Sequence, residues 1–147
     1  MSTHVTGLLL GGVCPAILLG VYAVLLKAGS KASLGLGPFL FLLGTSILAA
    51  SGIAFAVSPG RSFDLGAGKY VVLAGLTWAA STALISYAIS RHDMAISQLT
   101  PIFNTNTLVA VVLGLLIFAE WRDVHLVKLL SGTALIMLGG WLVSFAR

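Results

Sequence analysis

A stripe of polar side chains runs through the apolar segment between Ser97 and Gly114. A helix over this segment carries on one face, at alternating spacings of three and four, the residues Ser97, Thr100, Asn104, Thr107, Val111 and Gly114. An unpaired amide in hydrocarbon costs several kcal/mol, so Asn104 must meet protein, solute or water. The stripe predicts either an interhelical hydrogen bond or a substrate contact in a central cavity, with Thr100 and Asn104 as the candidate contacts.

Two other residues of this segment have different expected roles. Asn106 lies about 200° around the helix from Asn104, so we expect it to pack against another helix or a second copy. Pro101 has no N–H to donate to the carbonyl of Ser97, which predicts a bend. Irregular backbone at membrane depth is tolerated only beside protein or a wet cavity. The bend is therefore either a cavity feature or a plain kink.

Two further segments contribute candidate walls. Trp78, Ser81 and Thr82 are helical neighbours near the middle of their segment, whereas tryptophans that serve as interface anchors lie at membrane edges. This placement favours a cavity wall that includes Trp78 and Ser81. In the first segment Pro15 predicts a bend or hinge, and Tyr22 is either an interfacial aromatic or a second wall residue.

Acidic residues are absent from the middle of every apolar segment. The four of them stand at loops or segment ends: Asp64, Asp93, Glu120 and Asp123. Intramembrane carboxylates are a common means of binding protons and cations, so a neutral or zwitterionic substrate is expected instead. No metal-ligand spacing, phosphate loop or nucleophile–base pair is present. We expect no enzymatic activity, no metal and no cofactor.

Composition places the chain in lipid. It has 147 residues, of which 59% are hydrophobic and only 8% charged, where a soluble domain has about 25% charged residues. Too little charge is available to cover a water-facing surface. The eight basic residues are scattered and form no patch, which argues against a nucleic-acid partner. No Lys or Arg precedes Lys27, so we interpret the first apolar segment as a retained span and not as a secretory signal.

Five segments are long enough to cross the membrane, a crossing that takes about 20 apolar residues. They are predicted at residues 6–26, 38–57, 70–89, 96–119 and 126–146, joined by short polar connections. The expected fold is an all-α integral membrane protein with a single five-helix domain over residues 1–147. We expect it to be a multi-pass protein of the cell inner (plasma) membrane.

Basic residues are balanced between the two membrane faces. An odd number of spans puts Arg61, Lys69, Arg122 and Lys128 on one face, and it puts Lys27, Lys31, Arg91 and Arg147 on the other. The excess of Lys and Arg on one face sets the orientation of a membrane protein. A balance of four against four therefore imposes no orientation. Chance or a few dominant positions can explain this balance. Insertion in both orientations, with antiparallel pairing of two copies, is the alternative.

The stretch RHDMAISQLTPIFNTNTLVAVVLGLLIFAEWRDVHLVKLLSGTALIMLGGWLV, residues 91–143, resembles the end of an EamA-type domain of the drug/metabolite transporter superfamily. Shared features are Pro101 early in the fourth segment, Gly114 near its far end, Glu120 at its exit and the glycines of GTALIMLGG. Lys27 at the end of the first segment also fits. The resemblance implies one half of a ten-helix inverted-repeat transporter, as in the five-helix bacterial/archaeal transporter group.

Together these features predict a secondary transporter that moves a small polar metabolite by alternating access. The expected assembly is a homodimer of half-size units in membrane lipid, for which antiparallel pairing is one arrangement. Candidate substrate-binding residues are Asn104, Thr100, Trp78, Ser81 and Tyr22, and Pro15 and Pro101 are the expected bends. The alternative is a non-transporting membrane subunit, or half of a heteromer that flips lipid-linked sugars.

Overall fold

The computed structural model describes residues 3–31, 34–58, 64–122 and 124–145, in which every regular element is a helix. Their bounds are α1 Thr3–Leu8, the π-helix η1 Leu9–Val13, α2 Cys14–Lys31, α3 Leu36–Val57, α4 Leu65–His92, α5 Ile96–Phe103, α6 Asn106–Ile117, the 3-10 helix η2 Glu120–Arg122 and α7 Leu126–Ser144. Three charged residues considered above, Arg61, Asp123 and Arg147, lie outside the described residues.

Five helical stretches are long and apolar enough to span a membrane, as predicted from hydropathy. They are Val5–Lys31, Leu36–Val57, Leu65–His92, Ile96–Ile117 and Leu126–Ser144. Large apolar side chains along them are turned outward: Phe41 is 73% exposed and Val127 82% exposed. A water-soluble protein buries such residues, so the exposed apolar surface indicates a multi-pass membrane protein.

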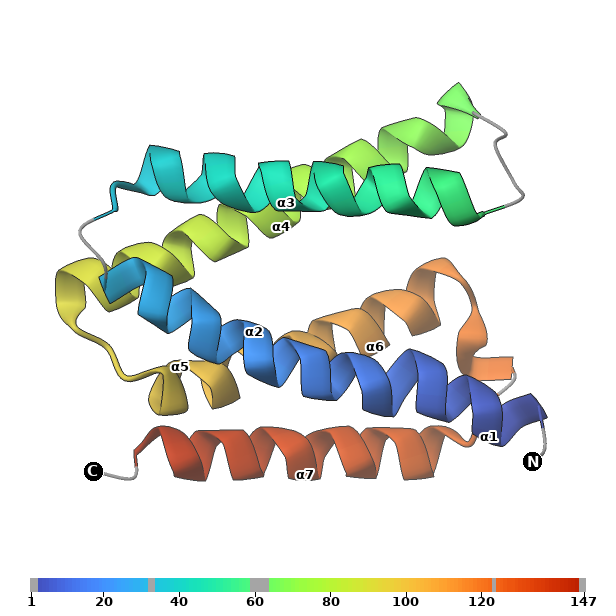
Figure 1. Cartoon of the computed structure of the whole chain (residues 1–147). Coiled ribbons are helices and arrows are strands. Elements are labelled where there is room, and N and C mark those ends of the chain that lie inside the picture. Colours follow the sequence, from blue (N-terminus) through green and yellow to red (C-terminus); the bar gives the residue numbers. More distant parts are fainter. Residues whose placement is uncertain (1–2, 32–33, 59–63, 123, 146–147) are drawn as a thin grey trace. The chain divides into compact units, whose positions relative to one another are not determined.

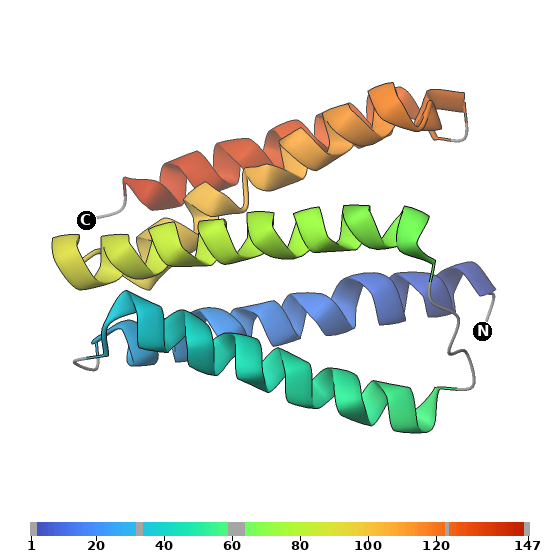
Figure 2. The same ribbon diagram turned by 90° about the horizontal axis from the view of Figure 1, so that it is seen from above.

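The chain divides into two compact units, Met1–Asp93 and Met94–Arg147. In the first unit, Figures 1 and 2 show α4 running alongside both α2 and α3, which it contacts. α2 and α3 approach at the ring of Phe39, which would lie 3.1 Å from a Cβ placed on Gly29. In the second unit, α7 runs alongside α5 and α6 and contacts both.

The first and third spans are longer than hydropathy predicts. The first continues through α1, η1 and α2 to Lys31, five residues beyond the predicted end, and α4 covers Leu65–His92 instead of 70–89. α4 starts early because the side chain of Asp64 accepts a hydrogen bond from the N–H of Gly66 at 2.8 Å, which caps the helix. It ends at His92, because the next residue, Asp93, has a left-handed φ of 47°.

Pro15 and Pro101 both mark irregular backbone. Pro15 is the second residue of α2 and directly follows the π-helical turn, in which the N–H of Cys14 bonds to the carbonyl of Leu9. Pro101 lies inside α5, which ends two residues later at Phe103. The fourth span, predicted over 96–119 with a bend at Pro101, is divided into α5 and α6 and ends at Ile117.

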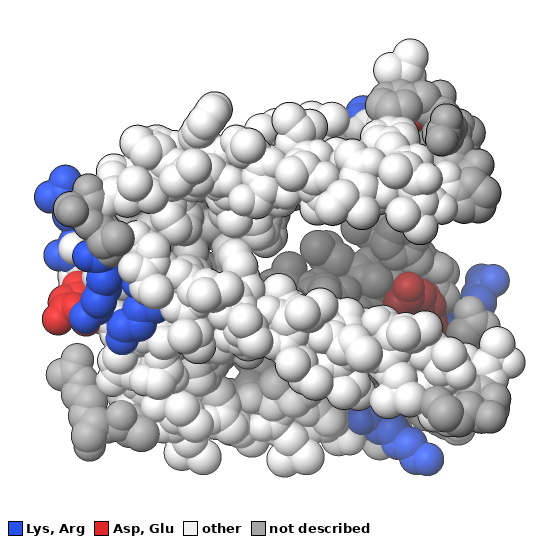
Figure 3. All heavy atoms as spheres, viewed as in Figure 1, with Lys and Arg blue, Asp and Glu red and all other residues white. Residues whose placement is uncertain are grey.

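Charged side chains lie toward helix ends, and other residues cover the middle of the face of the molecule shown in Figure 3. In the first unit Lys31 and Asp93 form an ion pair of 3.2 Å between the ends of α2 and α4. Both side chains are largely exposed, so this pair contributes little stability. In the second unit Arg122 and Lys128 flank the connection between α6 and α7.

Candidate functional site

The buried core of the first unit is a contact between one face of α2 and one face of α4, which we call the α2–α4 seam. Its residues follow spacings of three and four and comprise Tyr22, Ala23, Leu26 and Ser30 from α2 with Trp78, Thr82, Ser86 and Ile89 from α4. Three of them, Ser30, Thr82 and Ser86, are buried hydroxyl residues. The seam is thus more polar than the outer faces of the helices that form it.

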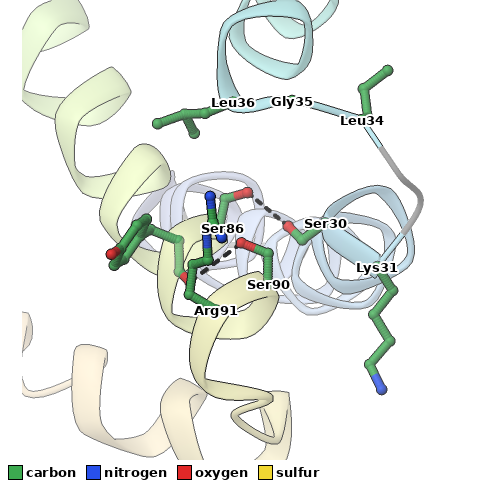
Figure 4. Close-up of a pocket in the computed structure, with 9 residues that line it drawn as sticks. Ser30, Lys31, Leu34, Gly35, Leu36, Ser86, Ser90 and Arg91 are labelled. Atoms are coloured by element: carbon green, nitrogen blue, oxygen red, sulfur yellow. Dashed lines mark hydrogen bonds between the residues drawn. The ribbon is translucent and has the colours of Figure 1, made fainter.

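Two hydrogen bonds between side chains join the helices along the seam. The hydroxyls of Tyr22 and Thr82 are 2.9 Å apart, and those of Ser30 and Ser86 are also 2.9 Å apart (Figure 4). Ser30 in addition donates to the carbonyl of Leu26, one turn earlier, at 2.8 Å. In hydrocarbon such bonds hold two helices in register, because each hydroxyl has a partner and no water competes.

Tyr22 and Trp78, two predicted wall residues from different spans, are neighbours in the structure. Their ring centroids are 5.8 Å apart with the planes tilted by 37°, a separation at which aromatic rings attract. Trp78 remains 38% exposed, so one side of the indole is open to a solute or to a second copy. Ser81, predicted to share this wall, lies on the exposed side of α4, outside the seam.

The seam yields a first testable prediction. Thr82→Val keeps the side-chain shape but removes the hydroxyl that bonds to Tyr22, so we expect a loss of about 0.6–2 kcal/mol in the free energy of unfolding. Thr77→Val is the matched control, because Thr77 is exposed and donates only within its own helix, to Leu73. Detergent-induced unfolding of both variants measures the difference. Equal stability of the two would show that the interhelical bond contributes nothing.

In the second unit, the fourth span is interrupted between Phe103 and Asn106, which we call the α5–α6 break. Asn104 and Thr105 keep helical φ but have ψ of −10° and −11°, values of the tighter 3-10 helix. The N–H groups of Thr105 and Thr107 accordingly bond three residues back, to the carbonyls of Ile102 and Asn104. The interruption begins three residues after Pro101, which itself lies inside the regular part of α5.

The side chains around the break differ in their hydrogen bonding. The hydroxyls of Thr100, Thr105 and Thr107 each donate to a backbone carbonyl of their own segment, Thr100 to Ile96 at 2.7 Å. Thr100 is half-buried, whereas Asn104 is exposed. Within the part of the chain that the structure describes, no hydrogen bond to the Asn104 amide is formed. Asn104 is thus available to a ligand, and Thr100 is engaged locally.

Close packing on α7 lies beside the same segment. A Cβ placed on Gly140 would lie 3.0 Å from the carbonyl oxygen of Pro101, so the glycine allows α5 and α7 to approach. A Cβ on Gly132 or Gly139 would meet no atom within 4 Å. Of these three glycines of α7, Gly140 alone packs closely within the unit.

Ser30 and Ser86 are seam residues that were not among the predicted candidates. The stretch KAGSKASLGLG is rich in glycine and polar residues, so its composition predicts a connection at Ser30. In the structure α2 continues to Lys31. The usable signal is spacing: Ser30 follows Tyr22 and Leu26 at intervals of four, and Ser86 follows Thr82 at the same interval. A hydroxyl residue that extends a helical stripe by one turn therefore indicates that the helix continues, even where composition indicates a loop.

Comparisons of this chain with protein-family models, with curated proteins and with solved structures found no match. Among the described residues, no three His, Cys, Asp or Glu side chains are grouped closely enough to hold a metal ion.

Proposed function

We propose that this chain is a half-size secondary transporter of the drug/metabolite transporter superfamily, which moves a small polar metabolite by alternating access. The observation that carries the proposal is the α5–α6 break, which leaves Asn104 exposed inside a span with a mean hydropathy of 1.7. Discontinuous helices near the middle of the membrane form the substrate sites of many transporters. An unpaired side-chain amide is costly in hydrocarbon, so we expect Asn104 to face protein or a wet cavity.

Two copies would be needed to enclose such a site. Several small residues leave open space beside them: no atom within 4 Å would meet a Cβ on Gly7, Gly11, Gly44 or Gly52. Glycine faces of this kind let helices of two protomers approach closely. Together with the balanced basic residues, this supports a homodimer, for which antiparallel pairing supplies the inverted halves that larger transporters carry in one chain.

The substrate class follows from the donors and acceptors available. The described carboxylates are Asp64 and Asp93 at the two ends of α4 and Glu120 in η2, all away from the middle of the spans. An amide at Asn104 and the aromatic pair of Tyr22 and Trp78 suit a neutral or zwitterionic solute. Thr100 and Ser81 are the remaining proposed contacts. For each of them, the proposed interaction would form only when a substrate or a second copy is present.

Water accessibility at the break tests the proposal without knowledge of the substrate. In a Cys14→Ser background, we expect Asn104→Cys to react with a membrane-impermeant maleimide at least about tenfold faster than Val109→Cys. Val109 is an apolar residue of α6 that is 58% exposed, and we expect it to face lipid. Labelling rates in sealed vesicles provide the measurement. Equally slow labelling of both would mean that no aqueous route reaches the break, and the transport proposal would fail.

A further inference from the structure

A cavity of about 570 Å³ lies at one end of the first unit, and none of the residues that line it is among those proposed above for transport. The ends of α2 and α4 and the start of α3 surround it (Figure 4), and its lining includes Ser86, Ser90, Arg91, Leu34 and Leu36. This volume lies within the range of small-molecule sites, about 300–1,000 Å³. α2 ends at Lys31 and α4 at His92, so the cavity is at the level where the spans leave hydrocarbon.

The hydroxyls of the cavity wall face it as hydrogen-bond acceptors. Ser30 donates its only proton to the carbonyl of Leu26, so in the bond between Ser30 and Ser86 the proton comes from Ser86. Ser86 therefore keeps free lone pairs and no free proton. Ser90 donates to the carbonyl of Tyr87 at 3.3 Å and likewise retains acceptor capacity. The negative ends of the α2 and α4 dipoles lie at the same place. This wall suits a group that carries N–H donors and positive charge.

The cationic part of the lining is Arg91. Lys31 also borders the cavity, but it is paired with Asp93 and extends away from the segment of Leu34 and Leu36 (Figure 4). The pair of Lys31 and Asp93 is the only ion pair among the described residues. Among those residues, Arg91 therefore has no carboxylate partner. A guanidinium offers a planar fork that matches phosphate oxygens. Leu34 and Leu36, 41% and 42% exposed, add an apolar border.

We propose that this cavity binds a phosphoethanolamine group, with its phosphate on Arg91 and its ammonium on the acceptors of Ser86 and Ser90. The group can come from a membrane lipid, phosphatidylethanolamine, or from free phosphoethanolamine. The chemistry at the protein is the same for both sources. The residues of this site are not those proposed for transport, so the proposal stands or falls independently of transport.

Binding to the purified full-length protein in detergent tests the site. The probes are dihexanoyl phosphatidylethanolamine, dihexanoyl phosphatidylcholine and free phosphoethanolamine, with Kd measured by titration calorimetry. The choline lipid has the same phosphate but no N–H donor, so we expect the ethanolamine lipid to bind about tenfold more tightly. Ser90→Ala should reduce this ratio without changing binding of the choline lipid.

Arg91→Gln is expected to weaken binding of the ethanolamine lipid at least about tenfold, because a charge-assisted contact to phosphate is lost. Lys69→Gln is the matched control: it removes a cation from the opposite end of α4, where Lys69 lies over the ring of Tyr70. Since Arg91 is exposed, both variants should melt at the same temperature as the parent protein.

Competition between the probes distinguishes the two sources. If free phosphoethanolamine displaces the lipid at similar concentration, the site exists and its ligand is soluble. If free phosphoethanolamine fails to displace the lipid, the site exists and its ligand is the lipid. The proposal is overturned by absence of binding for all three probes, by equal affinity for the two lipids, or by unchanged affinity in Arg91→Gln.

Discussion

Replacing Asn104 with alanine is expected to reduce solute uptake at least about tenfold while leaving the amount of folded protein unchanged. The physical reason is that a lost hydrogen bond in a desolvated site leaves the substrate group unpaired, at a cost of about 1–3 kcal/mol. Folding should be unaffected because Asn104 is exposed and its amide has no partner among the described residues. Uptake into proteoliposomes, from a panel of labelled neutral amino acids and other zwitterions, is the measurement.

Asn106→Ala is the matched control for this experiment. Asn106 is also an exposed amide and is the first residue of α6, but α-helical and 3-10 geometry both place it on a different face from Asn104, about 200° and about 240° around the axis respectively. We expect it to retain most of the uptake. Unchanged uptake in Asn104→Ala, at normal expression, would remove Asn104 from the transport site. Co-purification of a different partner in fixed stoichiometry would instead favour the heteromeric alternative.

The second large effect is expected at Gly140, where Gly140→Val should destabilise the second unit by about 1–3 kcal/mol through overpacking. Any Cβ at this position meets the backbone carbonyl of Pro101 at 3.0 Å, and a backbone atom next to a proline ring cannot rotate away. α5 and α7 must then separate, which also displaces the α5–α6 break. We expect the midpoint of thermal unfolding to fall by several degrees.

Gly139→Val provides the control for the change in helix propensity. Gly139 is exposed, and a Cβ there meets nothing within 4 Å, so the same substitution adds no clash within the unit. The difference in melting temperature between the two variants in the same detergent gives the effect of packing alone. If Gly140→Val melts no lower than Gly139→Val, the close approach of α5 and α7 makes no contribution to stability.

The five spans could be predicted because each depends only on the composition of its own segment. A run of about 20 apolar residues is driven into hydrocarbon as a helix whatever its neighbours are. The ends of the spans were less predictable. α2 continues through Ser30 and Lys31, and α4 starts at Leu65, because hydrogen-bonded caps and contacts between helices extend them beyond the hydrophobic segment.

The candidate site was predictable in its residue types but not in its pairings. Tyr22 and Trp78 were selected separately, and only the structure shows that their rings are in contact. Ser30 and Ser86 were missed because their partner lies on another helix. Pro101 predicted a bend, but the interruption falls at Asn104 and Thr105, where 3-10 hydrogen bonds replace those of the α-helix.

The sequence by itself determined that this is a five-helix membrane chain without an acidic group in the middle of its spans, since hydropathy and charge are sums over local residues. The tertiary structure decided that α2 and α4 share a buried hydroxyl seam, that Gly140 of α7 lies against Pro101 of α5, and that Ser30, Leu36 and Arg91 border one cavity. These pairings depend on which helix faces meet, and that choice is made by shape and hydrogen bonding between segments far apart in the chain.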